Sequence, residues 1–498
     1  MSRRRGLAGI VLLLAVTTAG CESGSPPSPD AGATGTAVPS ASSRSAPSDD
    51  PHSSAGPWTG ACPAERAAPD PDRPVVDVDF SLSDDGRTVT GSESVVFTPD
   101  LPTGELVFRL VPNGPGSSEK GNRLTVDRVR GDDVTRGHYE PAAAGPPGGR
   151  YVLPLTRRLA AGESTEVLLD FTLALGEGAF DRVGTADGAS WWASGAPLLA
   201  WEPGVGWAHD PFAGLLGETA ISPAADTTLS VEVPAGMTVL MTGDQAEPSA
   251  PRDGRRTWTS SEPAARDVSV AAGDFTTAET IVDGVRVTAG VLPAGNDGGD
   301  GAETRAQALT DATAAALTAL VDRFGAFPYR TLTVPQLTIL GGGIEYPSSI
   351  LLLGPPAGVL VHEVAHMWFY GMVGNSQFRD PWMDEAFASY AESVVTPVDP
   401  PAVATVVARA GDVGASMEEF PSNGSYVTAV YGKGAAMLLA AREAAGAAAF
   451  DAAVRCYVDA RAWAIATPTD VATALAGLPA ARDVLVAAGA LDVDDLPG

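Results

Sequence analysis

The sequence predicts an α+β protein with two folded domains, a β-rich domain followed by a mainly helical one. Three observations support this fold class. The chain has 498 residues, of which 44% are hydrophobic, and this is enough for two well-formed cores. Apolar and polar residues alternate from about residue 70 to 278, as in half-buried strands. Beyond that region, apolar residues recur at the spacing of a helix.

The first 20 residues have the pattern of an export signal. Three arginines at positions 3–5 precede an apolar segment, from about residue 7 to 16, that is too short to span a bilayer. Residues 18–21, TAGC, resemble a bacterial lipoprotein cleavage site. The resemblance implies that Cys21 becomes the lipidated first residue and anchors the protein to the outer face of the bacterial cell membrane. A plain secretory cut nearby, which would give a secreted protein, is the alternative.

Residues 21–60 predict a disordered tether that would lift the folded protein from the membrane. Ser, Pro, Gly, Ala and Thr dominate this stretch, and residues 22–57 hold one large aliphatic side chain, Val38. Such a composition cannot bury a core.

The amino-terminal β-rich domain is expected over residues 61–278. A period-2 run of apolar residues predicts its first strand, and the DDG sequence at 84–86 predicts a turn after it. A second clear run ends at Pro234. The alternating apolar residues of the two runs are Val76, Val78, Phe80, Leu82, Leu229, Val231 and Val233.

The second domain is expected over residues 279–498. A strand over residues 331–340, a short apolar strand at 350–353, and alanine-rich helices over 432–445 and 450–463 are predicted within it. A first helix is predicted from apolar residues at helical spacing: Leu309, Ala312, Ala316, Leu320 and Phe324.

The net charge limits the classes of molecule that the protein can bind, and the cysteine content limits its covalent links. The formal charge of -29 argues against a nucleic-acid partner, because cations that could neutralise phosphates are scarce. Of the 3 cysteines, Cys62 and Cys456 remain once Cys21 is assigned to lipidation. An exported protein permits a disulfide between them, and two free thiols are the equal alternative. Neither has metal-ligand spacing.

The run HEVAH at 362–366 predicts a zinc site. Two histidines four residues apart lie on one face of a helix, so His362 and His366 can reach a single ion. Glu363 points into the adjoining space, where a carboxylate can take a proton from water. The neighbouring residues are apolar, which argues against a solvated charged helix.

Glu385 completes the predicted ligand set. It follows His366 after eighteen intervening residues, near the start of a second helix for which Asp380 is expected as N-cap and Pro381 as first residue. Two histidines and one glutamate leave a fourth position open for water, which is the composition of a catalytic zinc site. One zinc ion per chain is therefore expected.

At these residues the chain resembles the gluzincin peptidases, specifically the family of aminopeptidase N and leukotriene hydrolase. The zinc signature carries most of the likeness, in the runs HEVAHMWFYGMVGN and WMDEAFA. The resemblance implies a saddle-like antiparallel sheet followed by a thermolysin-like, mainly helical catalytic domain. It also implies peptide substrates, with Glu363 as the general base.

Other motifs imply further site residues. The run GGIEYP at 342–347 is similar to the family's exopeptidase motif, which implies that Glu345 binds the free amino terminus of the substrate, although Ile344 and Tyr346 replace the usual Met and Asn. The run YGKG at 431–434 implies that Tyr431 stabilises the oxyanion. Glu202 is a candidate second anchor for the amino terminus, with a surface carboxylate as the alternative. Glu392 lies two helical turns beyond Glu385 and is a candidate partner for a metal ligand, with a solvated charge as the alternative.

Three functions follow from these residues. The first is a lipoprotein zinc aminopeptidase. The second is a zinc endopeptidase or other hydrolase on the same scaffold. The third is a non-catalytic surface lipoprotein that keeps zinc for stability or binding, although such a protein would not need Glu363 or Tyr431.

Overall fold

The computed structural model describes residues 60–496, except 179–181, 218–220, 294–300, 338–341 and 355–358. The expected signal peptide, Cys21 and nearly all of the expected tether lie outside the described residues. Within the described part, no helix is both long and apolar enough to cross a membrane.

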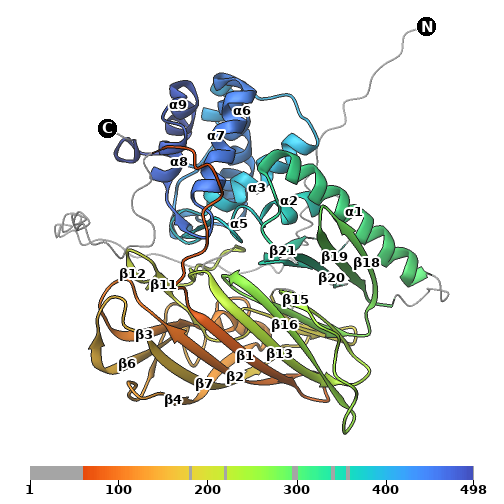
Figure 1. The fold of residues 1–498 in the computed structure, drawn as a ribbon. Helices are drawn as coiled ribbons and strands as arrows, with labels where there is room; N and C mark the ends of the chain where they lie inside the picture. Colours follow the sequence, from red (N-terminus) through yellow and green to blue (C-terminus); the bar gives the residue numbers. More distant parts are fainter. Residues whose placement is uncertain are drawn as a thin grey trace, which may run out of the picture.

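The first domain consists of β-sheets, which form the lower half of the molecule in Figure 1. Its largest sheet has seven strands in the order β15-β16-β13-β1-β2-β7-β4, with β1 parallel to β13 and antiparallel to β2. These strands are β1 (Val75–Leu82), β2 (Thr88–Phe97), β4 (Arg123–Arg130), β7 (Thr165–Ala174), β13 (Ala225–Pro234), β15 (Asp244–Gln245) and β16 (Arg255–Ala265).

Smaller sheets complete this domain. One has the order β10-β3-β6-β5, a second has the order β14-β17-β9-β8, and β11 pairs with β12. Their strands are β3 (Thr103–Arg109), β5 (His138–Glu140), β6 (Arg150–Leu159), β8 (Val183–Ala186), β9 (Ala189–Ala193), β10 (Leu198–Leu199), β11 (Trp201–Glu202), β12 (Gly206–Trp207), β14 (Thr238–Met241) and β17 (Ser269–Gly273).

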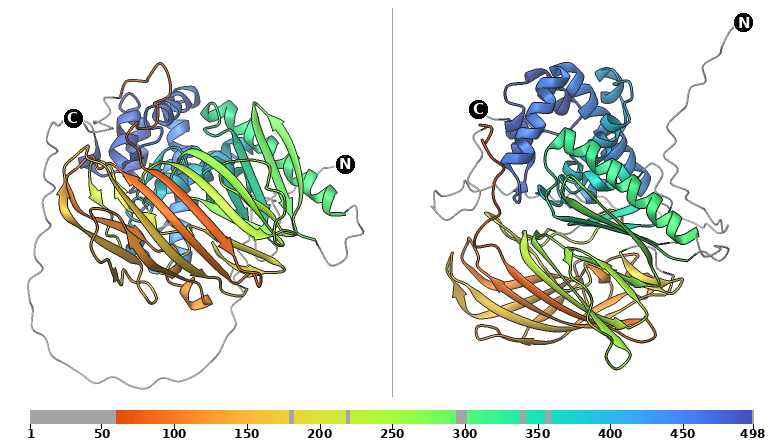
Figure 2. Two further views of the ribbon diagram at one scale, coloured as in Figure 1. Left: turned by 60° about the horizontal axis from the view of Figure 1, so that its bottom comes forward. Right: turned by 45° about the vertical axis from the view of Figure 1, so that its right-hand side comes forward.

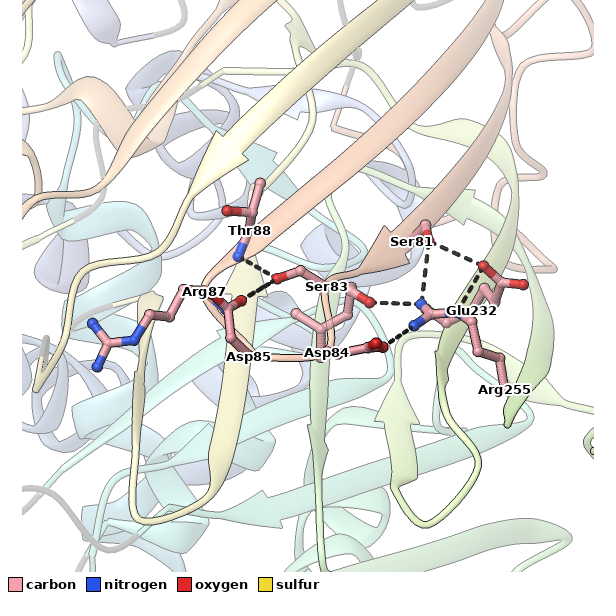
Figure 3. Close-up of polar contacts among 9 residues, drawn as sticks. Ser81, Ser83, Asp84, Asp85, Arg87, Thr88, Glu232 and Arg255 are labelled. Atoms are coloured by element: carbon pink, nitrogen blue, oxygen red, sulfur yellow. Dashed lines mark hydrogen bonds and ion pairs between the residues drawn. The ribbon is translucent and has the colours of Figure 1, made fainter. Parts of the chain in front are cut away.

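The predicted turn after the first strand is confirmed. Gly86 has φ of 69°, which a glycine adopts without strain, and Ser83 caps the turn by accepting a hydrogen bond from the Thr88 amide. Arg255 of β16, two strands from β1 in the same sheet, ties the turn to the sheet through Asp84 at 2.8 Å and Glu232 at 3.1 Å (Figure 3).

The second domain begins with a five-stranded sheet in the order β18-β19-β20-β22-β21. Its strands are β18 (Thr276–Val282), β19 (Val285–Val291), β20 (Thr331–Gln336), β21 (Gly343–Tyr346) and β22 (Ser349–Leu352). Helix α1 (Gly301–Phe324) covers one face of this sheet, as Figure 2 shows. The change of sheet falls between Gly273 and Thr276, whereas the expected domain boundary after residue 278 falls inside β18.

Helices form the rest of this domain, at the top of Figure 1. The two expected alanine-rich helices are confirmed as α6 and α7, and two short strands, β23 (Gly374–Asn375) and β24 (Ile465–Ala466), pair beside them. The helices are α2 (Leu360–Ala365), α3 (Trp382–Val395), α4 (Val403–Val407), α5 (Asn423–Tyr426), the π-helix η4 (Val427–Lys433), α6 (Gly434–Ala445), α7 (Ala447–Ala460), α8 (Pro468–Ala474) and α9 (Pro479–Ala487).

The buried face of α1 departs from the prediction at one residue. Leu309, Ala316, Leu320 and Phe324 are buried as expected, but Ala312 is exposed. Thr313 is buried in its place, because its hydroxyl donates to the Leu309 carbonyl at 2.8 Å and so needs no contact with water.

An N-terminal strap, residues 60–74, joins the two domains before β1 begins. Figure 1 shows it descending from the helices to the sheets. Gly60 lies beside Thr473 of α8, Arg66 forms a salt bridge with Asp459 at 3.0 Å, and Cys62 forms a disulfide with Cys456 of α7. Of the two states that the sequence left open for these cysteines, the structure has the disulfide.

Removing this disulfide should destabilise the folded protein. The bond closes a loop with a sequence separation of 394, so its loss frees a large amount of chain entropy in the unfolded state. We expect Cys456→Ser to lower the free energy of unfolding by about 2–5 kcal/mol in urea titrations. The reduced wild type should match the variant, and an unchanged unfolding midpoint would show that the bond does not stabilise the fold.

Candidate metal centre and active site

Two short helical segments bring the predicted ligands together. His362 lies in α2 and His366 is its C-terminal cap residue, while Glu385 lies in the first turn of α3. The start of α3 differs from the prediction. Pro381, and not Asp380, occupies the cap position, and the helix begins at residue 382 without a side-chain cap.

The three candidate ligand atoms converge. Nε2 of His362 lies 3.1 Å from Nε2 of His366, and Oε2 of Glu385 lies 3.1 Å and 3.4 Å from these two nitrogens. Ligands of a tetrahedral zinc ion with bonds of 2.0–2.1 Å are about 3.3 Å apart. The donor types and their spacing therefore fit zinc.

The electrostatics of this cluster also suit a cation. Burial alone would lower the pKa of His366, but Glu345, Glu385 and Glu363 surround it and raise its pKa well above the ordinary value. Burial alone would raise the pKa of Glu385, and the two histidines outweigh burial and lower it. Three carboxylates around two imidazoles give an excess of negative charge that a divalent ion would neutralise.

Neighbouring groups orient both imidazoles. Nδ1 of His366 lies 3.1 Å from the Phe369 carbonyl, so it carries the proton and leaves Nε2 free to bind metal. Nδ1 of His362 lies 3.4 Å from the Ser389 hydroxyl. Ser389 was not predicted from the sequence, although its position four residues after Glu385 places both on one helical face. Glu392 was the residue predicted to be a partner for a metal ligand. Burial raises the pKa of Glu392, and the nearby charge of His362 opposes this rise.

Asp384 is a second residue that the sequence analysis missed. It is almost fully buried beside Glu385, accepts a hydrogen bond from the Gln377 amide at 3.1 Å, and accepts the Glu385 backbone N–H at 2.8 Å. Burial, and then the charge of Glu385, raise its pKa to about 8. The sequence feature that could have indicated Asp384 is an acidic residue next to the predicted metal ligand Glu385, in a helix whose other residues are mostly apolar.

Glu363 and Glu345 lie together beside His366. One ligand atom from each of these three residues lies within 4.8 Å of the others. Strand β21 can approach Glu363 this closely because residue 343 is glycine, where a Cβ would lie 2.5 Å from Cγ of Glu363. Glu345 is 4% exposed, and among the described residues its Oε1 has no hydrogen-bond partner. A buried carboxylate oxygen left in this state is suited to receive a cationic group.

Tyr431 reaches the same site from the π-helix η4. Its ring stacks on His362, with ring centroids 5.8 Å apart and planes inclined by 11°. Burial of the hydroxyl, followed by the charge of Glu385, raises its pKa well above the ordinary value, so the hydroxyl keeps its proton at neutral pH. Such π-helical turns are frequent at functional sites.

Glu202 is already engaged. Its carboxylate, on β11, accepts a hydrogen bond from the guanidinium of Arg379, which precedes α3. The Arg379 Nε also donates to the Ser376 hydroxyl at 3.0 Å. A substrate ammonium would have to compete with Arg379 for Glu202, so a role of this residue in binding the amino terminus remains a prediction.

Comparison with solved structures identifies the fold. The M1 zinc metallopeptidase of Deinococcus radiodurans superposes with a TM-score of 0.60 at 21% identity, over 86% of this chain and 94% of that chain. A mutant of that protein bound to a Tyr-Ser-Ala substrate superposes with a TM-score of 0.60 at 21% identity, over 84% of this chain and 94% of that chain. A two-domain M1 zinc metallopeptidase mutant bound to L-tryptophan has a TM-score of 0.60 at 19% identity, over 88% of this chain and 98% of that chain. The chain has the fold of the M1 zinc metallopeptidases.

The M1 fold confirms the predicted fold class, a β-rich domain followed by a thermolysin-like helical one. No family model and no curated protein matches the sequence. At 19–21% identity the likeness establishes the fold. The roles of individual residues therefore depend on the geometry of the site.

Proposed function

We propose that this protein is a zinc-dependent aminopeptidase that removes the amino-terminal residue of peptides. One observation carries the proposal. The zinc-ligand cluster, the acid Glu363 and the carboxylate of Glu345, whose Oε1 has no hydrogen-bond partner in the described part of the chain, share one buried site. The Deinococcus radiodurans protein, which has the same fold and binds a tripeptide substrate, supports it.

Each residue has a task in this reaction. His362, His366 and Glu385 would hold the zinc ion, which when bound polarises a scissile carbonyl and acidifies water. Glu363 takes a proton from the attacking water and returns it to the leaving amine. Tyr431 donates its hydroxyl hydrogen to the oxygen on which negative charge develops. Glu345 accepts the substrate ammonium, which places the first peptide bond at the site and disfavours peptides with blocked amino termini.

Export is part of the proposal. The signal-like residues 1–20 and the TAGC run support export of the protein and its attachment to the outer face of the bacterial cell membrane through a lipidated Cys21. The mass of the mature amino-terminal peptide distinguishes a lipidated Cys21 from a plain secretory cut.

The decisive experiment compares one peptide with a free amino terminus and the same peptide acetylated, both with the zinc-loaded protein. We expect kcat/KM to be much higher for the free peptide. Glu345→Gln should lower kcat/KM for the free peptide by about 10- to 100-fold, since a neutral amide replaces the carboxylate whose charge strengthens its bond to the substrate ammonium. Glu418→Gln, the same change at an exposed position, is the matched control.

The other outcomes identify the alternatives. Equal cleavage of both peptides would indicate an endopeptidase. Cleavage of neither, across varied side chains, would indicate a non-catalytic zinc protein.

A further inference from the structure

Strand β21 places Glu345 at the site, whereas the residues on either side of Glu345 face the amino-terminal domain. Successive side chains of a strand point to opposite faces. Glu345 lies with Glu363 and His366, whereas Ile344 and Tyr346 pack into a hydrophobic cluster. Residues of the amino-terminal domain in that cluster include Ala189, Trp191, Ala193, Leu240 and Ala271. The residue that binds substrate and the residue that meets the other domain are therefore adjacent in sequence.

Tyr346 is held at its hydroxyl by the amino-terminal domain. The side chain is 1% exposed, and its hydroxyl accepts a hydrogen bond from Nη1 of Arg182 at 3.1 Å. Arg182 directly precedes β8. Burial raises the pKa of Asp267, in the loop before β17, and the nearby charge of Arg182 opposes this rise. The tyrosine ring thus spans the boundary between the two domains.

The turn after β21 is fixed to the same domain. Ser348 has φ of 51°, and its hydroxyl accepts the Gly243 N–H at 2.9 Å. The Ser269 hydroxyl donates to the Ser349 hydroxyl at 2.8 Å. These two bonds and the Arg182–Tyr346 bond form what we call the interdomain clamp.

The clamp matters because β21 is the last strand of its sheet among the described residues. It pairs with β22 on one side, from Gly343 to Tyr346. A four-residue edge strand has few backbone bonds to fix its position. The contacts to the amino-terminal domain supply the missing constraint.

We propose that Tyr346 is a positioning residue for Glu345: held by Arg182, it sets the place of the carboxylate that receives the substrate ammonium. This inference rests on the proposed aminopeptidase function. It explains why a tyrosine can stand where the similar motif has asparagine. Tyr346 faces away from the site, so it acts on the substrate only through Glu345.

The test is Tyr346→Phe, which removes one oxygen atom and keeps the buried ring. We expect kcat/KM for the free peptide to fall by about threefold to tenfold, through a higher KM and with little change in kcat, because one hydrogen bond is lost. Arg182→Met should also lower kcat/KM for the free peptide, and Tyr346→Phe should cause little further loss in the Arg182→Met background. Tyr139→Phe is the control, since its hydroxyl is also hydrogen-bonded, to Val126 at 3.1 Å within the first domain.

A double-mutant cycle with Glu345→Gln separates positioning from a general structural effect. If Tyr346 acts through Glu345, Tyr346→Phe should have little further effect in the Glu345→Gln background. The same fold loss in both backgrounds would overturn the inference, as would an unchanged KM. Should Tyr346→Phe fail to fold, Arg182→Met leaves the core ring in place, removes the same hydrogen bond and carries the same cycle.

Cleavage of free and acetylated peptide by the wild type tests the proposed function separately from the role of Tyr346. Equal cleavage of free and acetylated peptide by the wild type would overturn both. Discrimination by the wild type, kept in full by Tyr346→Phe, would overturn only the role of Tyr346.

Discussion

Replacing Glu363 with glutamine should lower kcat by about 10²- to 10⁴-fold while the protein still binds one zinc ion. Glutamine keeps the shape of the side chain that packs against Gly343, but it cannot accept a proton. The three candidate zinc ligands are untouched by the change. Zinc content by elemental analysis and kcat on an aminoacyl reporter substrate are the two measurements.

Controls make this result specific to the proton transfer. Glu443→Gln, at an exposed position on α6, should leave both quantities unchanged. Retained turnover in Glu363→Gln would remove Glu363 as the base. If unchelated, folded wild-type protein held no stoichiometric metal, the whole assignment of the site would fall.

Tyr431→Phe should lower kcat by about 10²-fold or more, with a modest change in KM. The phenylalanine ring can still stack on His362, so the change isolates the hydroxyl. A tyrosine hydroxyl is protonated at neutral pH, and burial and the charge of Glu385 shift the pKa of Tyr431 further upward, so the hydroxyl can donate as the oxyanion forms. An interaction made in the transition state and absent from the ground state affects kcat and not KM.

The matched control for this variant is Tyr390→Phe. The Tyr390 hydroxyl donates to Asp451 at 3.3 Å within the helical domain, so its loss tests the removal of a buried hydroxyl in general. An unchanged kcat in Tyr431→Phe would mean that another group stabilises the oxyanion.

The sequence predicted those parts of the site that lie on one local element or follow from spacing. His362, Glu363 and His366 share one short helical segment, and helical geometry alone places them near each other. Glu385 could be predicted as a ligand because the eighteen residues after His366 place it near the start of the next long helix. The alternation of apolar residues likewise predicted β1 and β13.

The contacts that the sequence did not reveal are between distant segments. Nothing local to Glu202 indicates that Arg379 lies against it, since 177 residues separate them. The Arg182–Tyr346 bond joins residues 164 positions apart, in different domains. Such pairs are set by how the two domains pack, which depends on their complete surfaces. The π-helical turn at Tyr431 was also missed, because no residue pattern in this segment distinguishes it from an α-helix.

The N-terminal strap has a consequence for how the molecule is assembled. The helical half is completed by a piece of chain that is synthesised first, because Cys62 must wait for Cys456 before the two can be oxidised together. A shortened version that begins at β1 would lack Arg66 as well as the covalent link. The covalent link between the two ends of the described chain can therefore form only after nearly all of the residues between Cys62 and Cys456 have been synthesised.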